Sequence, residues 1–104
     1  MSVAVTVLYF DGCPSWQTAL ERLHTASTRA GVPVQVSSRL VETQDEAEEM
    51  AFPGSPTIMV NGVDPFAQPD QVPALACRVY ETPYGRAGSP TVDQLVDALT
   101  ASTG

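Results

Sequence analysis

The chain has 104 residues, the size of one domain, and a formal net charge of −7. A surface this acidic repels phosphate backbones, so we expect no nucleic-acid partner, and its apolar runs are too short for a membrane-spanning helix, so we expect no membrane partner. Two Cys and one His cannot alone build a four-ligand zinc site, and we expect neither a metal nor another cofactor.

The first half of the chain predicts a strand, a helix and a second strand. Residues 3–10 are almost continuously apolar and rich in β-branched residues, which is typical of a central strand buried on both faces. Pro14 suits the first turn of a helix, and Gly31 is placed to end it. Residues 34–41 predict the second strand. This β-α-β order implies a right-handed crossover between parallel strands.

The second half predicts two more helices and two more strands. A capping box at Thr43 and Glu46 predicts a short helix over residues 44–50, and residues 57–60 predict a third strand that ends at an Asn-Gly turn. Residues 64–76 contain three prolines and predict an ordered loop, before a fourth strand over residues 77–81. The last helix begins at a second capping box, and its apolar stripe is Val92, Leu95, Val96 and Leu99.

The resulting order, β-α-β-α-β-β-α, predicts an α/β fold in a single domain over residues 1–104. We expect a four-stranded mixed sheet with helices on both faces, in which the third and fourth strands form a hairpin. The fourth strand would lie at an edge of the sheet, where a second copy of the chain could pair with it. The sequence therefore leaves a homodimer open.

The segment that carries chemistry is Phe-Asp-Gly-Cys-Pro-Ser-Trp, over residues 10–16. It places Cys13 directly after a buried strand and at the start of a helix, where free N–H groups and the helix dipole favour a thiolate. The thiolate is the nucleophilic form of cysteine. Asp11 acts in the opposite direction, because a nearby carboxylate disfavours a second negative charge. The sequence leaves open which effect is larger, and Cys13 is the candidate nucleophile.

These residues, together with Gly-Ser-Pro-Thr at 54–57, resemble the thioredoxin and glutaredoxin superfamily over nearly the whole chain. The resemblance implies a thioredoxin-like fold with its nucleophile at Cys13 and a cis-proline at Pro56 lying against the thiol. It also implies that the backbone before this proline pairs with an incoming thiol substrate in the manner of a β-strand. The implied substrate-binding residues are Gly12, Pro14, Trp16, Ser55 and Pro56.

Within that superfamily the chain most resembles a small bacterial group, the DF family (seleno)protein type. The shared pattern is Asp-Gly-Cys-Pro with a Trp three residues after the Cys, here Cys13 and Trp16. Some members of the group carry selenocysteine at the position of this Cys. The resemblance therefore implies redox chemistry or strong nucleophile chemistry at Cys13.

One departure from the superfamily restricts the mechanism. Trp16 stands where a C-x-x-C enzyme has its second cysteine, so no resolving thiol lies one helical turn from Cys13. Three alternatives stay open: resolution by a small thiol, resolution by the distant Cys77, or thiolate binding without turnover. A plain hairpin places Cys77 at the wrong end of the fourth strand, whereas a loop over residues 64–76 that crosses back would allow a Cys13–Cys77 disulfide.

Other residues near the motif have ordinary structural interpretations. We expect Trp16 to pack between the first helix and the preceding loop, with shielding of the thiol as a secondary role. His24 is two to three turns from the start of its helix and is expected at the surface. Arg78 either offsets a thiolate charge or pairs with an acid, for which Glu81 and the acidic run over residues 45–49 are the candidates.

The leading hypothesis is a thiol-based redox protein, with oxidoreductase or peroxidase-like activity on disulfides, peroxides or small thiol adducts. Its partner would be a small thiol or a protein thiol. Residues 1–10 show no basic segment ahead of the apolar run, so we expect no signal peptide and a cytosolic location. Two alternatives are a binder of soft metals or organomercurials through Cys13 and Cys77, and a non-catalytic thioredoxin-fold interaction module.

Overall fold

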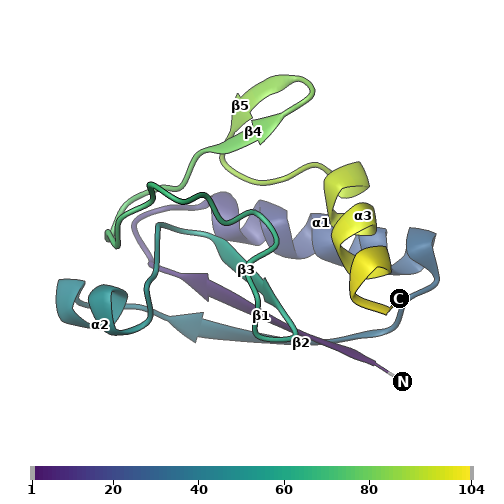
Figure 1. Cartoon of the computed structure of the whole chain (residues 1–104), viewed down its shortest axis with the longest axis horizontal. Coiled ribbons are helices and arrows are strands. Elements are labelled where there is room, and N and C mark those ends of the chain that lie inside the picture. Colours follow the sequence, from purple (N-terminus) through teal and green to yellow (C-terminus); the bar gives the residue numbers. More distant parts are fainter. Residues whose placement is uncertain (1, 104) are drawn as a thin grey trace.

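The computed structural model describes residues 2–103. Within that range the chain forms a mixed α/β fold, with a small hairpin before the last helix (Figure 1). The elements are β1 (Val3–Tyr9), α1 (Ser15–Ala30), β2 (Val34–Leu40), α2 (Gln44–Glu49), β3 (Thr57–Val60), β4 (Tyr80–Thr82), β5 (Gly85–Ala87) and α3 (Val92–Thr103). The elements up to β3 and the last helix lie where the sequence predicts them, whereas the stretch between β3 and α3 differs.

A three-stranded mixed sheet in the order β2-β1-β3 forms the centre of the fold. β1 runs parallel to β2, from Val3 opposite Val34 to Tyr9 opposite Leu40, and it runs antiparallel to β3. The central position of β1 and its parallel pairing with β2 are therefore confirmed.

The predicted four-stranded sheet is wrong, because β4 pairs with β5 in a separate two-stranded sheet. Within the described residues, the turn after β3 forms a single bridge, between Val60 and Val63, and not the predicted hairpin. Pro65, Pro69 and Pro73 follow, and a proline has no N–H to donate to a strand ladder. The chain therefore leaves the sheet, whose edges are β2 and β3 and not a fourth strand.

The hairpin of β4 and β5 takes up only the end of the predicted strand over residues 77–81, so Cys77 lies before it in an irregular segment. Its turn falls at residues 82–85. The hairpin projects away from the sheet (Figure 1), and Tyr84 in its turn is exposed.

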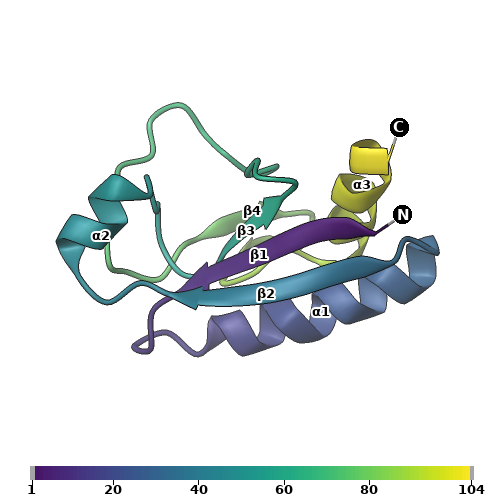
Figure 2. The same ribbon diagram turned by 90° about the horizontal axis from the view of Figure 1, so that it is seen from below.

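The main core lies between one face of the sheet and the paired helices α1 and α3 (Figure 2). The alternate β1 residues Val3, Val5 and Val7 enter this core, as expected for a strand with one buried face. Burial of a Val, Leu or Ile side chain contributes about 1.5–3 kcal/mol relative to exposure. The buried members are Val3, Val5, Val7, Ala19, Leu23, Ala26, Ile58, Val60, Leu95 and Leu99.

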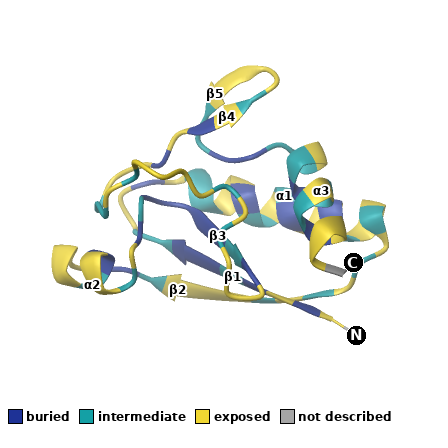
Figure 3. Cartoon of the chain, in the orientation of Figure 1, coloured by how far each residue is buried: buried dark blue, intermediate teal, exposed yellow. Residues whose placement is uncertain are grey.

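A smaller apolar cluster on the opposite face joins the end of β1 to α2. It contains Leu8, Val41, Ala47 and Phe52. Nearer the start of β1 this face is open, since Ala4 is exposed (Figure 3). The prediction that β1 is buried on both faces is therefore wrong near its start, where Ala4 is exposed and Thr6 is half-buried, because α2 has only six residues and covers the other end.

The predicted capping boxes are confirmed. The Glu46 N–H donates to Thr43 Oγ1 at 3.1 Å. The Gln94 N–H donates to Thr91 Oγ1 at 3.1 Å, and the Thr91 N–H donates to Gln94 Oε1 at 2.9 Å. These bonds satisfy N–H groups that have no partner inside the helix. None of the helices within residues 2–103 has the length and apolar character that crossing a membrane requires.

Candidate functional site

Cys13 lies in the turn that joins β1 to α1. Its N–H donates to the carbonyl oxygen of Phe10 at 3.3 Å, and α1 begins two residues later at Ser15. Pro14 is the N-cap of this helix, and no side chain caps the helix start. The first N–H groups of a helix have no partner within the helix, so this end of α1 favours negative charge. The structure thus places Cys13 at a helix start, as predicted.

Cys77 reaches this helix start from the other half of the chain and forms a disulfide with Cys13. The Cα atoms of the two residues are 5.7 Å apart, within the usual range for a bridged pair. The loop after β3 therefore crosses back over the start of α1, which is the arrangement that the sequence left open. The two residues differ in burial, because Cys13 is only 1% exposed whereas Cys77 is exposed.

The backbone of Ser55 holds the segment that carries Cys77. The Ser55 N–H donates to the carbonyl oxygen of Ala76 at 2.8 Å, and the Arg78 N–H donates to the carbonyl oxygen of Ser55 at 2.9 Å. These two bonds form a parallel bridge between Ser55 and Cys77. The Ser55–Pro56 peptide bond is cis, and Cys13 Sγ lies 3.6 Å from the Ser55 carbonyl oxygen.

Gly54 allows this close approach. Its φ is +137°, a conformation that L side chains rarely adopt, and an added Cβ would lie 3.0 Å from both the Ala76 carbonyl oxygen and Arg78 Cβ. A methyl group at position 54 would therefore both strain the backbone and push against the segment next to Cys77.

Replacing Gly54 with Ala is expected to lower the free energy of unfolding by about 1–3 kcal/mol, through backbone strain and this clash. Gly62→Ala is the matched control, because Gly62 also has positive φ, +81°, but has no atom within 4 Å of an added Cβ. We expect a loss of about 1 kcal/mol in that variant, from conformation alone. Denaturant unfolding of both oxidised variants measures the difference, and equal losses would contradict the close approach at Gly54.

Arg78, next to Cys77, is the buried anchor of the loop. Its side chain is 2% exposed and pairs with Asp64 at 2.8 Å between Nη1 and Oδ2. Its Nη2 donates to the carbonyl oxygen of Phe66 at 2.7 Å. Of the alternatives that the sequence left open, pairing with an acid is the one found, but the acid is neither Glu81, which pairs with Arg86, nor a member of the run over residues 45–49. The sequence did not identify Asp64, because its partner lies fourteen residues further along the chain.

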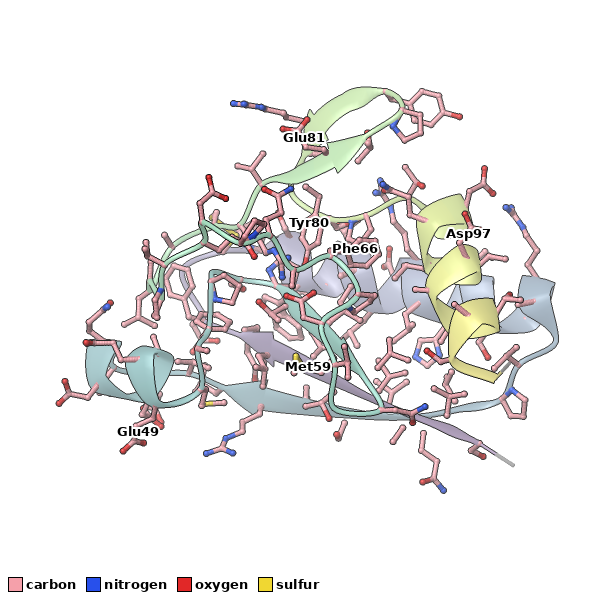
Figure 4. All side chains as sticks on the ribbon, viewed as in Figure 1. Glu49, Met59, Phe66, Tyr80, Glu81 and Asp97 are labelled. Atoms are coloured by element: carbon pink, nitrogen blue, oxygen red, sulfur yellow. A yellow bond between two sulfur atoms is a disulfide. The ribbon has the colours of Figure 1, made fainter. Side chains whose placement is uncertain are left out.

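Tyr80 completes the surroundings of Arg78. Its ring lies under the Arg78 guanidinium, 4.5 Å from the guanidinium carbon to the ring centroid. It meets the Phe66 ring edge to face at 5.5 Å, and Figure 4 shows the two side chains next to each other. The Tyr80 hydroxyl donates to the carbonyl oxygen of Pro56. Burial raises the pKa of Tyr80 well above its usual value, so the phenol stays protonated at neutral pH.

Two buried polar atoms in this region have no hydrogen-bond partner within the described residues. They are Ser55 Oγ and Arg78 Nε. A buried polar group without a partner costs about 1–3 kcal/mol. Both residues hold the Cys77 segment through other atoms, so the bonds that position the disulfide form in spite of this cost.

The remaining predicted site residues lie in the turn that carries Cys13 or in the first turn of α1. Gly12 and Pro14 flank Cys13 and are exposed. Trp16 stacks on Tyr9, with ring centroids 4.3 Å apart, which supports the packing role that we expect for it. His24 is exposed, as predicted.

Residues 2–103 contain no group of three or more His, Cys, Asp and Glu side chains that could hold a metal ion. In comparisons with known proteins, no family model matches the chain and no curated protein matches its sequence.

Proposed function

We propose that this chain is a thioredoxin-like thiol–disulfide exchange protein whose redox pair is Cys13 and Cys77. The observation that carries the proposal is the disulfide between these two residues at the start of α1. A disulfide with a purely structural role would need only the two cysteines. Here the segment around Cys77 is also held by backbone pairing to Ser55, which keeps both sulfurs close together when the bond is open.

Three further features support the thioredoxin-like part of the proposal. A cysteine follows the central strand at the start of α1, a Ser-Pro pair precedes β3, and the β-α-β unit is parallel. In the superfamily that the chain resembles, the backbone before the proline pairs with an incoming thiol partner. In this chain the same backbone, at Ser55, receives the residues on either side of Cys77. Cys77 would thus take the place of the second cysteine that Trp16 replaces.

The proposed reaction moves two electrons between this pair and a second thiol pair. In the reducing direction, two external thiols lose their protons and electrons to the protein disulfide, leaving two cysteine thiols and one external disulfide. In the oxidising direction the electrons pass to an external disulfide. A peroxide could also accept them, because attack by a thiolate gives a sulfenate and an alcohol or water, and the second thiol then forms the disulfide and releases water.

We propose the cytosol as the place of action and a small thiol or a protein thiol as the partner. In that compartment glutathione and thioredoxin keep thiols reduced, so a disulfide there is usually transient and catalytic. A disulfide that is reduced and formed again in every catalytic cycle is compatible with this reducing compartment.

Replacing Cys13 with Ser is expected to abolish release of the second glutathione when the reduced protein reacts with glutathione disulfide, since no disulfide can then form at the start of α1. The reaction should stop at a glutathione adduct on the remaining cysteine, while the far-UV circular dichroism spectrum stays that of the wild type. The exposed residue His24 supplies the matched control, and His24→Ser should retain the wild-type rate. Release of two glutathiones per molecule of Cys13→Ser would sink the proposal.

A further inference from the structure

We infer that Cys77, and not Cys13, is the sulfur at which an external thiol enters and leaves this disulfide, with Cys13 as the leaving and resolving thiolate. The inference rests on the proposed function and assigns separate roles to the two sulfurs. It reverses the roles that the sequence suggests, in which Cys13 meets the substrate and Cys77 resolves the adduct.

The first reason is access. A thiolate attacks a disulfide sulfur from the side opposite the leaving sulfur, and exchange rates depend on which sulfur can be reached. Cys13 is 1% exposed. Cys77 lies in the irregular segment before β4 and is exposed. We therefore expect an external thiolate to reach Cys77 more readily than the buried Cys13.

The second reason is the stability of the leaving group. Attack on Cys77 releases Cys13 as a thiolate at the start of α1, where no side-chain cap competes for the first N–H groups. A thiol that is more stable as its anion leaves faster. Asp11 opposes this effect, but Asp11 is exposed and water screens its charge. Attack on Cys13 would instead release Cys77 as the thiolate, and the segment that carries Cys77 is not the start of a helix.

The third reason is that Cys77 stays in place after the bond opens. Its neighbour Arg78 remains tied to Asp64 and to the Phe66 carbonyl oxygen, with the ion pair almost fully buried. The bridge to Ser55 holds the backbone on both sides of Cys77. An adduct on Cys77 thus remains next to Cys13, which can attack it without any rearrangement of the loop.

A thiol of the glutathione type reduces the protein disulfide in two steps. The external thiolate forms a bond to Cys77 Sγ, the bond between Cys77 and Cys13 breaks, and Cys13 takes the electron pair as a thiolate. A second external thiolate then attacks the external sulfur of the adduct, which gives glutathione disulfide and a Cys77 thiolate. Two protons from the two external thiols end on the two cysteines. In the oxidising direction Cys77 attacks glutathione disulfide, and Cys13 resolves the adduct.

Single-cysteine variants test this assignment, with glutathione disulfide as the probe. Reduced Cys13→Ser, which keeps Cys77, is expected to form the glutathione adduct at least about tenfold faster than reduced Cys77→Ser, which keeps Cys13. The same two variants in 6 M guanidinium chloride are the control, and there the rates should converge because access is equal. An equal or faster rate for Cys77→Ser in the folded state overturns the inference.

A second measurement uses the wild-type protein, so the assignment does not depend on variants that fold. Oxidised protein is mixed briefly with glutathione and quenched with acid, and the free thiols are then blocked with N-ethylmaleimide. Cleavage after Arg22, Arg39 and Arg78 puts the two cysteines on different peptides. We expect glutathione on the Cys77 peptide and maleimide on the Cys13 peptide, and the reverse labelling contradicts the inference.

Equilibration of the wild type in glutathione redox buffers separates this inference from the proposed function. If the pair does not interconvert between dithiol and disulfide, the proposed function fails. If the pair interconverts but the adduct forms on Cys13, only the order of the sulfurs is wrong.

Discussion

Replacing Asp64 with Ala is expected to lower the free energy of unfolding by about 3–5 kcal/mol, because it leaves the Arg78 guanidinium buried without its carboxylate. The two side chains are 2% and 13% exposed, so water cannot replace the missing partner. Within the described residues Arg78 Nε has no hydrogen-bond partner, and after the change the guanidinium would keep uncharged partners such as the Phe66 carbonyl oxygen and the Tyr80 ring but no carboxylate. Domains of this size are stable by about 5–15 kcal/mol, so the loss would be a large part of the total.

Urea unfolding of the oxidised protein measures this effect, and Asp93→Ala is the matched control. Asp93 pairs with Arg29 at 2.7 Å, but the side chains are 78% and 56% exposed, and exposed pairs contribute about 0–1 kcal/mol. A double variant that replaces Asp64 with Leu and Arg78 with Met should recover part of the loss, because it removes both buried charges. Similar small losses in Asp64→Ala and Asp93→Ala would show that the buried pair does not anchor the loop.

Loss of the disulfide is expected to lower the free energy of unfolding by about 4 kcal/mol, because Cys13 and Cys77 are 64 residues apart and their bond restricts a long loop of the unfolded chain. Cys77→Ser tests this with little other change, since Cys77 is exposed and its side chain adds little to the core. The variant is compared with oxidised wild-type protein by chemical unfolding.

Reduced wild-type protein provides the internal check on this value. It should unfold at the same denaturant concentration as Cys77→Ser, since both lack the bond and keep every other contact of the loop. The free energy that the disulfide adds to folding equals, by linkage, the free energy by which folding favours formation of the disulfide. The same measurement therefore gives both quantities. A reduced protein as stable as the oxidised one would contradict both statements.

The helices and the central strand could be predicted because their signals are local. Thr91 and Gln94 mark a helix start within four residues, and Gly31 marks a helix end by its position alone. The apolar run of β1 predicts a central strand for the same reason. Burial of the second face of β1 could not be predicted, because it depends on how far α2 reaches across the sheet.

The path of the loop between β3 and β4 could not be predicted, because contacts far along the chain hold it. The Asn-Gly turn suggests a hairpin, but the prolines remove strand donors, and Arg78 finds a partner in Asp64 that no short-range pattern indicates. The candidate nucleophile Cys13 and the backbone of Ser55 could be named in advance from local motifs. The pairing of Cys13 with Cys77 could only be left open, since it depends on that loop.

The bridges at the two ends of β3 have a consequence for the behaviour of the protein at high concentration. Val63 pairs back onto Val60 at one end, and Cys77 pairs with Ser55 just before the other, so the chain itself covers both ends of an edge strand. Unshielded strand edges recruit further strands and lead to aggregation. The opposite edge, β2, presents the exposed charge of Arg39, which discourages such pairing. The disulfide between Cys13 and Cys77 also fixes one of these two bridges, so its loss is expected to loosen the cover at that end of β3 and to raise the tendency to aggregate.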